Sequence, residues 1–248
     1  MTENRVPPSR RRSTRVPLAD RAYNELLLQV ISGQRPPGDR LNIGALSREM
    51  NLSATPIREA LARLEPTGFV RHHPLRGYVV APLLNPTEIE QLMDARLLFE
   101  PVFAAEAAAD PSPEFLEQLV DTIESMERAG DVTDAEALKQ SWLADESFHT
   151  LISTQTRNPF IHHAFAALGS QLQRFRLSGE AGRTHALEAA QEHRAIYEAI
   201  SSGDEVAAEE LMRSHIEEAR RRTLMDERAV STAHPSQPSK ARRATTRS

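Results

Sequence analysis

Four side chains in the second half of the sequence are of types that bind metal ions. Asp145 and His149 lie four residues apart, which places them on one face of a helix, and His193 and His215 follow later in the chain. Each shares a helical stripe with apolar residues, so we expect all four to point into an apolar core. A divalent ion would offset the cost of burying the carboxylate, but hydrogen-bonded core histidines and a simple Asp145–His149 pair fit the spacing too.

The donor set limits which ion such a site could take. Imidazole and carboxylate ligands suit zinc, nickel, manganese or iron, and the absence of cysteine excludes sulfur-rich sites. Among these ions we expect zinc. Four protein ligands would fill a tetrahedral ion, whereas an ion with five or six ligands would keep positions open for water or an incoming carboxylate.

Arg96 is the residue that we expect to hold such a carboxylate, because a guanidinium group can bind one through two parallel hydrogen bonds. Glu100 lies four residues further on, so a salt bridge within one helix is an equally good interpretation of Arg96. Arg174 and Arg176 are alternatives for the same role.

A second set of residues, nearer the N-terminus, is suited to contact DNA. Ser53, Thr55 and Arg58 stand at the start of an expected helix, where a helix-turn-helix protein meets base edges in the major groove. Arg58 falls opposite the apolar stripe of that helix, and arginine is the side chain best suited to guanine. The other candidates are Arg48 and Arg63 for phosphates and His73, Arg76 and Gly77 for a neighbouring groove. Any single arginine here could equally be a solvated surface charge.

The elements that would carry these DNA-contacting residues follow one another within residues 18–82. Apolar periodicity and turn residues predict, in order, helices over Leu18–Ser32, Ile43–Met50 and Thr55–Pro66 and strands over Phe69–His72 and Gly77–Val80. A sharp NLSATP turn separates the second helix from the third. This order is that of a winged helix-turn-helix.

Residues 83–228 carry no strand signal and are expected to form the helical domain that holds the metal-binding residues. Six helices are predicted, near 86–109, 113–129, 133–155, 158–178, 183–202 and 204–227. Proline, glycine or asparagine stands in most of the gaps, and the short connections favour an antiparallel bundle. The expected fold class is therefore mainly α.

Charge is distributed unevenly along the 248 residues, whose net charge is −5. Residues 18–82 contain eight arginines against six acidic residues, whereas residues 83–228 contain 28 acidic residues against 13 basic ones. A polyanion is attracted to the first segment and repelled by the second. Residues 1–17 and 229–248 are basic and rich in Pro, Ser and Thr, so we expect two disordered tails. Without a membrane-spanning stretch or a secretory signal, we expect a cytoplasmic protein.

The stretch from Pro37 to Val79 closely resembles the signature of the GntR family of bacterial regulators. The matching residues read PGDRL at 37–41, LSATPIREAL at 52–61, GFV at 68–70 and RGYV at 76–79. The resemblance implies a winged helix-turn-helix that binds an operator in double-stranded DNA. Many members have arginine in place of Ala54 and a polar or basic residue in place of Gly44, so the operator sequence is not implied.

The helical domain resembles the ligand-binding domain, known as FCD, of the FadR-type members of that family. The matching segments read DESFH at 145–149, NPF at 158–160, EHRAIYEAISSGD at 192–204 and MRSH at 212–215, with Arg96 and Glu100 in the opening helix. In many members the matching Asp and three His bind a metal, and an organic acid completes its coordination. The resemblance implies these roles for Asp145, His149, His193 and His215, and six helices suggest the shorter branch of the subfamily.

Together these features favour a homodimeric transcriptional repressor that a small organic acid releases from its operator. Two alternatives stay open: a metal-dependent enzyme with an appended DNA-binding domain, and a regulator whose helical domain only dimerises. The strong candidates for chemistry are all metal ligands and leave no separate general base, so we expect no catalytic residue.

Overall fold

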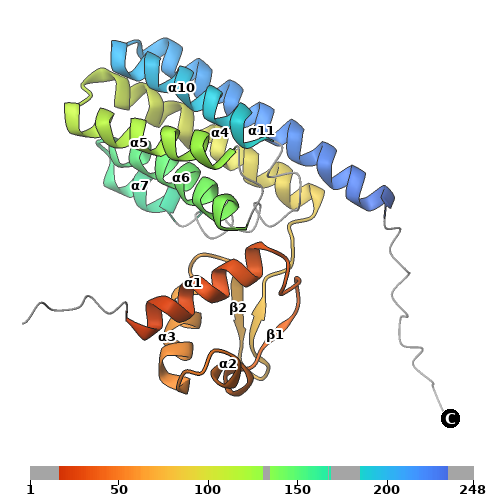
Figure 1. Cartoon of the computed structure of the whole chain (residues 1–248). Helices are drawn as coiled ribbons and strands as arrows, with labels where there is room; N and C mark the ends of the chain where they lie inside the picture. Colours follow the sequence, from red (N-terminus) through yellow and green to blue (C-terminus); the bar gives the residue numbers. More distant parts are fainter. Residues whose placement is uncertain (1–16, 131–134, 167, 169–184, 234–248) are drawn as a thin grey trace, which may run out of the picture.

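The structure is a computed structural model that describes residues 17–130, 135–166, 168 and 185–233. It consists of a small N-terminal unit and a larger helical unit, joined near residue 85 (Figure 1). The prediction of a mainly α fold with a winged helix-turn-helix is confirmed. The later part of the helix predicted over 158–178, with Arg174 and Arg176, lies outside the described residues.

The N-terminal unit has three helices and a small sheet. Its elements are α1 (Leu18–Ile31), β1 (Arg40–Leu41), α2 (Ile43–Glu49), α3 (Ala54–Leu64), β2 (Val70–His73) and β3 (Gly77–Val80). The sheet is antiparallel with the order β1-β3-β2, and its register pairs Arg40 with Val79 and Val70 with Val80. β1 was not predicted, because a strand of two residues is too short to show an alternating pattern.

Burial of one face of α3 explains how this unit presents the opposite face. Ile57, Leu61 and Leu64 are fully buried at the centre of the core. The spacing of three or four residues that predicted the helix also turns Arg58 toward solvent. α2 begins at Asn42, whose side chain accepts a hydrogen bond of 2.9 Å from the Ala45 amide, as an N-cap residue does.

The helical unit contains long helices that run back and forth. The described ones are α4 (Pro86–Ala109), α5 (Pro113–Gly130), α6 (Ala135–Thr154), α7 (Pro159–Ala166), α10 (Ala186–Ser202) and α11 (Glu205–Ala233). α4 begins with a capping box, in which Asn85 and Glu88 each accept a hydrogen bond from the other's backbone amide. α11 runs to Ala233, past residue 228, because no proline or glycine occurs between Gly203 and Pro235.

One apolar core holds this helical unit together. α4 packs along α11, α5 packs against α6 and α10, and α10 packs against α11. The core includes Phe103 of α4, Leu119 of α5, Phe148 of α6, Ile196 of α10 and Ile216 of α11, each at most 1% exposed. Phe165 of α7 joins the same core, so the six described helices of this unit share it, and polar side chains that enter it are cut off from water.

α6 also connects the two units. Leu138 and Trp142, near its N-terminal end, are 6% and 8% exposed and belong to the core of the N-terminal unit. In Figure 1, α6 runs along the lower side of the helical unit directly above α1, with which it is in contact. Leu138 and Trp142 lie on the same helix as Asp145 and His149, but they are buried between the two units rather than inside the bundle.

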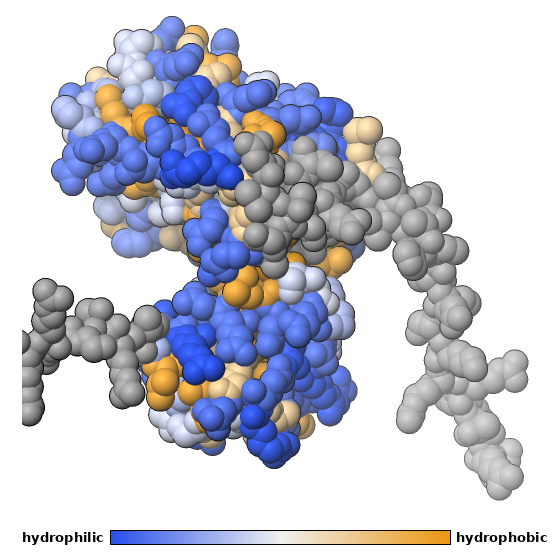
Figure 2. Space-filling model, in the orientation of Figure 1, coloured by the Kyte–Doolittle hydropathy of each residue, from blue (hydrophilic) through white to orange (hydrophobic). Residues whose placement is uncertain are grey.

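The outer surface is largely hydrophilic. Figure 2 shows small apolar patches scattered over the face that it presents, rather than one broad patch. Large apolar side chains with high exposure include Leu98 on α4 (74%) and Phe160 on α7 (82%). Among the described residues, no helix is both long enough and apolar enough to cross a membrane.

Candidate metal centre and DNA-binding surface

The hairpin of α10 and α11 places two of the predicted ligands opposite each other. α10 ends at Gly203, whose positive φ of 75° closes the turn, and the Asp204 amide donates back to the Ala199 carbonyl at 3.0 Å. Asp204 then accepts from the Ala207 amide and begins α11. His193 and His215 lie at nearly equal distances along the chain from this turn, so they meet across the two helices.

α6 brings the other two predicted ligands to the same point. His149, His193 and His215 are 4%, 0% and 4% exposed, and each offers a ring nitrogen within 4.8 Å of the others. Asp145 Oδ1 lies 3.8 Å from His149 Nε2 and 3.7 Å from His193 Nε2. The structure therefore brings together all four residues that the sequence singled out.

Two of the histidines are held in place by buried or half-buried carboxylates. Glu100 Oε2 accepts from His149 Nδ1 at 2.6 Å, and Glu192 Oε2 accepts from His215 Nδ1 at 2.7 Å. Glu192 is in turn bound by both terminal nitrogens of Arg222, at 2.5 and 2.9 Å. A proton on each Nδ1 leaves each Nε2 with a lone pair directed into the cluster.

His193 is fixed by packing rather than by a carboxylate. Its ring stacks on Phe148 with the centroids 3.9 Å apart and the planes 6° from parallel. Its Nε2 lies 3.3 Å from His215 Nε2, and its Nδ1 is buried without a hydrogen-bond partner among the described residues. A buried ring nitrogen without a partner is costly, so this histidine is placed for a role other than stability.

Burial favours the neutral form of two of the histidines, His193 and His215. Burial lowers the pKa of His193 well below its usual value, and His215 and His149 add to the effect. Burial likewise lowers the pKa of His215, although the hydrogen bond to Glu192 opposes it. Neutral imidazole is the form that binds metal ions, so these two histidines need lose no charge to become ligands.

The two supporting carboxylates stay ionised in spite of their burial. Burial would raise the pKa of Glu100, but Arg96 and His149 outweigh it and hold that pKa far below its usual value. At Glu192 burial would also raise the pKa, but hydrogen bonds from Arg222 and His215 lower it to about 2. Each carboxylate can therefore accept the Nδ1 proton of its histidine.

The residues present fit a divalent ion. Three Nε2 atoms and one carboxylate oxygen converge, the imidazoles are buried, and two of them carry the carboxylate partners typical of metal-binding histidines. Among the described residues, no side chain or backbone group pairs with Nδ1 of His193, so their hydrogen bonds alone do not satisfy the cluster. The donor set of nitrogen and oxygen suits zinc, nickel, manganese or iron.

Arg96 borders this cluster, and the predicted alternative of a helix salt bridge is present. Its Nε donates to Glu100 Oε1 at 2.5 Å and its Nη2 to Glu100 Oε2 at 3.2 Å. Arg96 is 4% exposed and Glu100 is 1% exposed, so the pair is buried beside the histidines. The same Nη2 also lies 3.2 Å from His149 Nε2. A residue that is paired with Glu100 can therefore still face the site.

The predicted DNA-contacting residues all lie on the surface of the N-terminal unit. Those at the start of α3 or on its outer face are Ser53, Thr55, Arg58 and Arg63, Arg48 lies on α2, and His73, Arg76 and Gly77 form the tip between β2 and β3; all are exposed. Gly77 has a positive φ of 72°, which allows the tight turn of that tip. The Ser53 side chain makes no capping hydrogen bond, so its hydroxyl is available at the N-terminus of α3.

Arg63 differs from the other candidates because it is engaged within the protein. It donates to Asp20 of α1, and its guanidinium lies 4.8 Å from the centre of the Tyr23 ring. These contacts tie the end of α3 to α1. That Arg63 contacts a phosphate stays a prediction. The ion pair with Asp20 does not favour it, because the guanidinium is already engaged.

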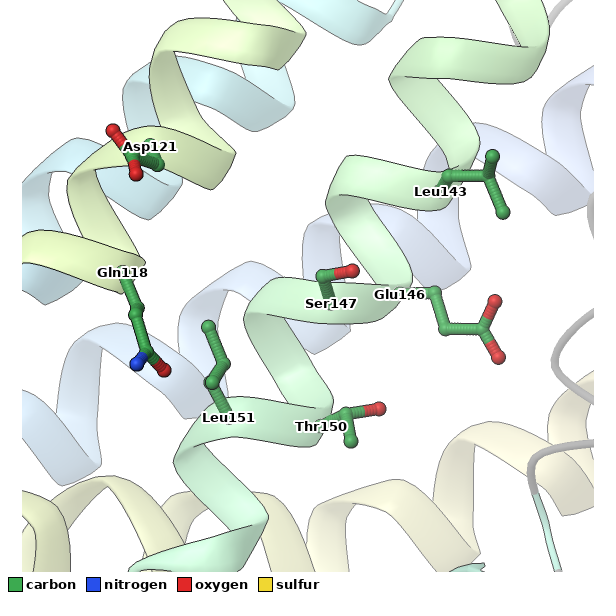
Figure 3. A pocket seen from close by; sticks show the side chains of 7 residues that line it. All are labelled: Gln118, Asp121, Leu143, Glu146, Ser147, Thr150 and Leu151. Atoms are coloured by element: carbon green, nitrogen blue, oxygen red, sulfur yellow. The ribbon is translucent and has the colours of Figure 1, made fainter. Parts of the chain in front are cut away.

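A groove on the outer side of the helical unit does not suit an acidic ligand. It has a volume of about 520 Å³ and lies between α5 and α6 (Figure 3). Its lining residues are Gln118, Asp121, Leu143, Glu146, Ser147, Thr150 and Leu151. Two of the seven are acidic and none is basic, so an organic acid would meet repulsion there.

Three residues of the centre were not assigned to it from the sequence. Glu192 and Arg222 were not singled out, and Glu100 was considered only as a partner of Arg96. The one local signal is that Glu192 directly precedes His193. Glu192 on α10 contacts His215 on α11. This contact depends on how the two helices are aligned with each other, which the spacing of residues within one helix does not reveal.

Two family models match the chain. Residues 18–80 match the bacterial regulatory proteins of the gntR family, and residues 91–218 match the FCD domain. LutR of Bacillus subtilis (strain 168) is 25% identical over 205 residues, which cover 75% of this chain and 91% of LutR. The probable D-xylose utilization operon transcriptional repressor of Paenarthrobacter nicotinovorans is 23% identical over 206 residues, which cover 83% of this chain and 88% of that protein.

The fold agrees with a solved structure of the same kind. The E. coli McbR/YncC structure has a TM-score of 0.62 at 19% identity, and the match covers 90% of this chain and all of that one. A winged helix-turn-helix joined to a helical FCD domain defines a DNA-binding transcriptional regulator. The chain belongs to the gntR family of bacterial regulatory proteins, in the subfamily with an FCD domain. The gntR family and the relative LutR are transcriptional regulators and not enzymes.

Proposed function

We propose that this regulator is a cytoplasmic, homodimeric repressor. A small organic acid, bound at a metal in the helical domain, lowers its affinity for the operator. The observation that carries the proposal is the convergence of three buried histidines and Asp145, with each histidine nitrogen within 4.8 Å of the others. A regulator that only dimerises through this domain has no use for such a cluster.

In this proposal Asp145, His149, His193 and His215 hold the ion, with zinc as the resident metal and nickel, manganese or iron as alternatives. The bound ion supplies a positive charge and free coordination positions for a carboxylate. Arg96 binds the same carboxylate from the side of α4. The metal ion and the Arg96 guanidinium would both be positive charges in a buried site. A negatively charged organic acid therefore fits as the effector better than a neutral metabolite does.

On the DNA side, the start of α3 enters the major groove of the operator. Arg58 reads a guanine, Ser53 and Thr55 contact the neighbouring bases or phosphates, and Arg48 binds phosphate. The tip formed by His73, Arg76 and Gly77 reaches the adjacent groove. One such unit offers little contact, so two copies related by a two-fold axis bind two half-sites.

α6 is suited to carry the signal between the two sites. It bears Asp145 and His149 in the helical core, and it bears Leu138 and Trp142 in the core of the N-terminal unit. A helix moves nearly as a rigid body, so a shift of α6 at the metal centre changes how its N-terminal end packs against α1. The effector can shift DNA affinity only by its differential affinity for the two arrangements. The similarity to a D-xylose operon repressor supports repression as the output.

A binding assay on the full-length protein tests this proposal. Gel-shift titrations on the DNA upstream of the chain's own gene are performed with zinc-loaded protein, with and without a panel of small carboxylic acids. We expect at least one acid to weaken binding about fivefold or more, a typical size for allosteric coupling. Arg96→Met should lose this response. Indifference of the zinc-loaded protein to every acid would overturn the sensing proposal, while absence of binding to any duplex at low salt would contradict the DNA-binding assignment.

A further inference from the structure

Arg222 lies two helical turns beyond His215 on α11, and both contact the same carboxylate of α10. Seven residues separate them, a spacing that returns almost to the same face of a helix. Glu192 Oε2 accepts from His215 Nδ1 at 2.7 Å and from Arg222 Nη2 at 2.9 Å. Glu192 Oε1 accepts from Arg222 Nη1 at 2.5 Å. Both oxygens of this carboxylate are therefore engaged, and one of them joins the arginine to the histidine.

We propose that Arg222 is a positioning residue of the metal centre, which acts on His215 through Glu192. This inference rests on the proposed function and extends it, because it makes metal affinity depend on a side chain two contacts away from the ion. Arg222 also lies outside residues 91–218, which match the FCD domain. The centre would thus draw on a part of α11 beyond that match.

Glu192 needs such a clamp because water can reach it. Its side chain is 26% exposed, whereas those of His215 and Arg222 are 3% and 8% exposed. A partly exposed glutamate has other rotamers open to it, and in those rotamers it would release His215 Nδ1 and leave the ring free to turn. Two parallel hydrogen bonds from a planar guanidinium fix both the place and the plane of a carboxylate.

Arg222 is itself held firmly enough to serve as a clamp. Glu188, one turn before Glu192 on α10, has its Oε2 3.9 Å from Arg222 Nη1. Two residues before Arg222, Arg220 donates to Asp94 of α4 at 2.5 Å. This stretch of α11 is therefore tied to α10 and to α4, although the helix continues to Ala233.

The test measures the zinc affinity of the full-length protein by competition with a chromophoric chelator. Arg222→Met keeps a stem of similar length but donates no hydrogen bond. We expect it to bind zinc about fivefold more weakly than the wild type, somewhat less than the loss of about tenfold for removal of an outer-shell partner itself. Arg222→Lys keeps the charge and a donor but not the two-bond geometry, so it should restore most of the affinity, to within about twofold of the wild type.

A double-mutant cycle distinguishes action through Glu192 from a merely structural role. Glu192→Ala should weaken zinc binding about tenfold. If Arg222 acts only through this carboxylate, adding Arg222→Met to Glu192→Ala should change the affinity by less than about twofold. A packing defect in α11 would instead lower the affinity by the same factor in both backgrounds.

Arg194→Met is the matched control. Arg194 of α10 makes the same kind of two-bond contact, with Glu127 of α5 at 2.9 and 3.0 Å, and it directly follows His193 in the sequence. Its loss should leave zinc affinity unchanged. If Arg222→Met fails to fold, Arg222→Gln takes its place in every comparison, since a neutral amide also cannot clamp both oxygens of Glu192, and the same loss is expected.

The outcomes separate this inference from the proposed function. If the wild type binds zinc and the Arg222 variant binds it equally well, the positioning role is overturned while the metal site stands. The same holds if the losses in the Arg222 and Glu192 variants simply multiply in the double variant. If the wild type binds no zinc at all, the metal site and the positioning role are overturned together.

Discussion

Glu192 illustrates how a residue outside the proposed ligand set can position one of its members. It accepts from His215 Nδ1 and is held by Arg222, so it fixes both the ring orientation and the tautomer of that ligand. The convergence of the four proposed ligands could be predicted, because each lies on the apolar stripe of its own helix. Glu192 and Arg222 could not, because their contacts with His215 depend on how α10 and α11 cross.

Replacing Glu192 with glutamine should weaken zinc binding about tenfold, the usual cost of losing an outer-shell carboxylate partner. The amide oxygen can still accept from His215, so the fold should be retained. Isothermal titration or chelator competition measures the change. Glu188→Gln, one turn earlier and 57% exposed at its side chain, is the control and should bind zinc as the wild type does. Equal affinities in Glu192→Gln and wild type would contradict the role of Glu192.

The depressed pKa of His193 predicts how stability depends on pH in chelator-treated protein. The unfolded chain takes up a proton near pH 6.5, the usual value for this group, whereas buried His193 does not. The free energy of unfolding should therefore fall as the pH is lowered from about 7 to 5. Glu192, with a pKa lowered to about 2, contributes only below its usual value of 4.5.

Urea unfolding at several pH values, followed by circular dichroism, measures this dependence. His193→Asn should show a smaller loss of stability between pH 7 and 5 than the wild type, because the proton uptake of the unfolded chain is reduced by one site. Identical slopes for the two proteins would show that His193 titrates alike in the folded and unfolded states, against this account.

Among the elements, α6 is the one whose full role emerged only in three dimensions. Its helical period and its apolar stripe were evident, and its bounds of Ala135–Thr154 agree with the predicted segment over the described residues. The same stripe serves two cores, however, since Trp142 packs with the N-terminal unit and Phe148 with the helical core. An apolar stripe predicts that a face is buried and does not specify against what.

Trp142→Leu should uncouple the two units while leaving the metal centre intact. A smaller side chain loosens the contact between α6 and α1 and so removes part of the coupling energy. The operator affinity of the variant should therefore change with zinc and acid by less than about half as much as that of the wild type. Zinc affinity should stay within about twofold. Gel shifts and chelator competition measure the two quantities.

Leu143→Ala is the matched control for this experiment, because Leu143 is the next residue on α6, points into the outer groove and is 38% exposed. It should respond to zinc and acid as the wild type does. A full response in Trp142→Leu would show that the signal does not pass through this contact.

At the scale of the whole molecule, charge is divided between a basic N-terminal unit and an acidic helical one. This division was visible in the charge of the sequence, and the order of elements was enough to predict both folds. The exposed arginines of α2 and α3 and the buried histidines of the bundle lie in different units, and α6 touches both. The contact between the units could not be predicted, because residues 135–142 and α1 are far apart in the sequence.

The most direct test of the account is whether the histidine cluster holds a metal. Native mass spectrometry and chelator competition on full-length protein should show a single zinc ion per chain in the wild type and in His163→Asn, whose histidine is exposed on α7. His193→Asn should bind zinc about 100-fold more weakly, as expected for the loss of a ligand, while its helical circular dichroism is unchanged. Zinc binding that is equally tight in His193→Asn and wild type would contradict the account.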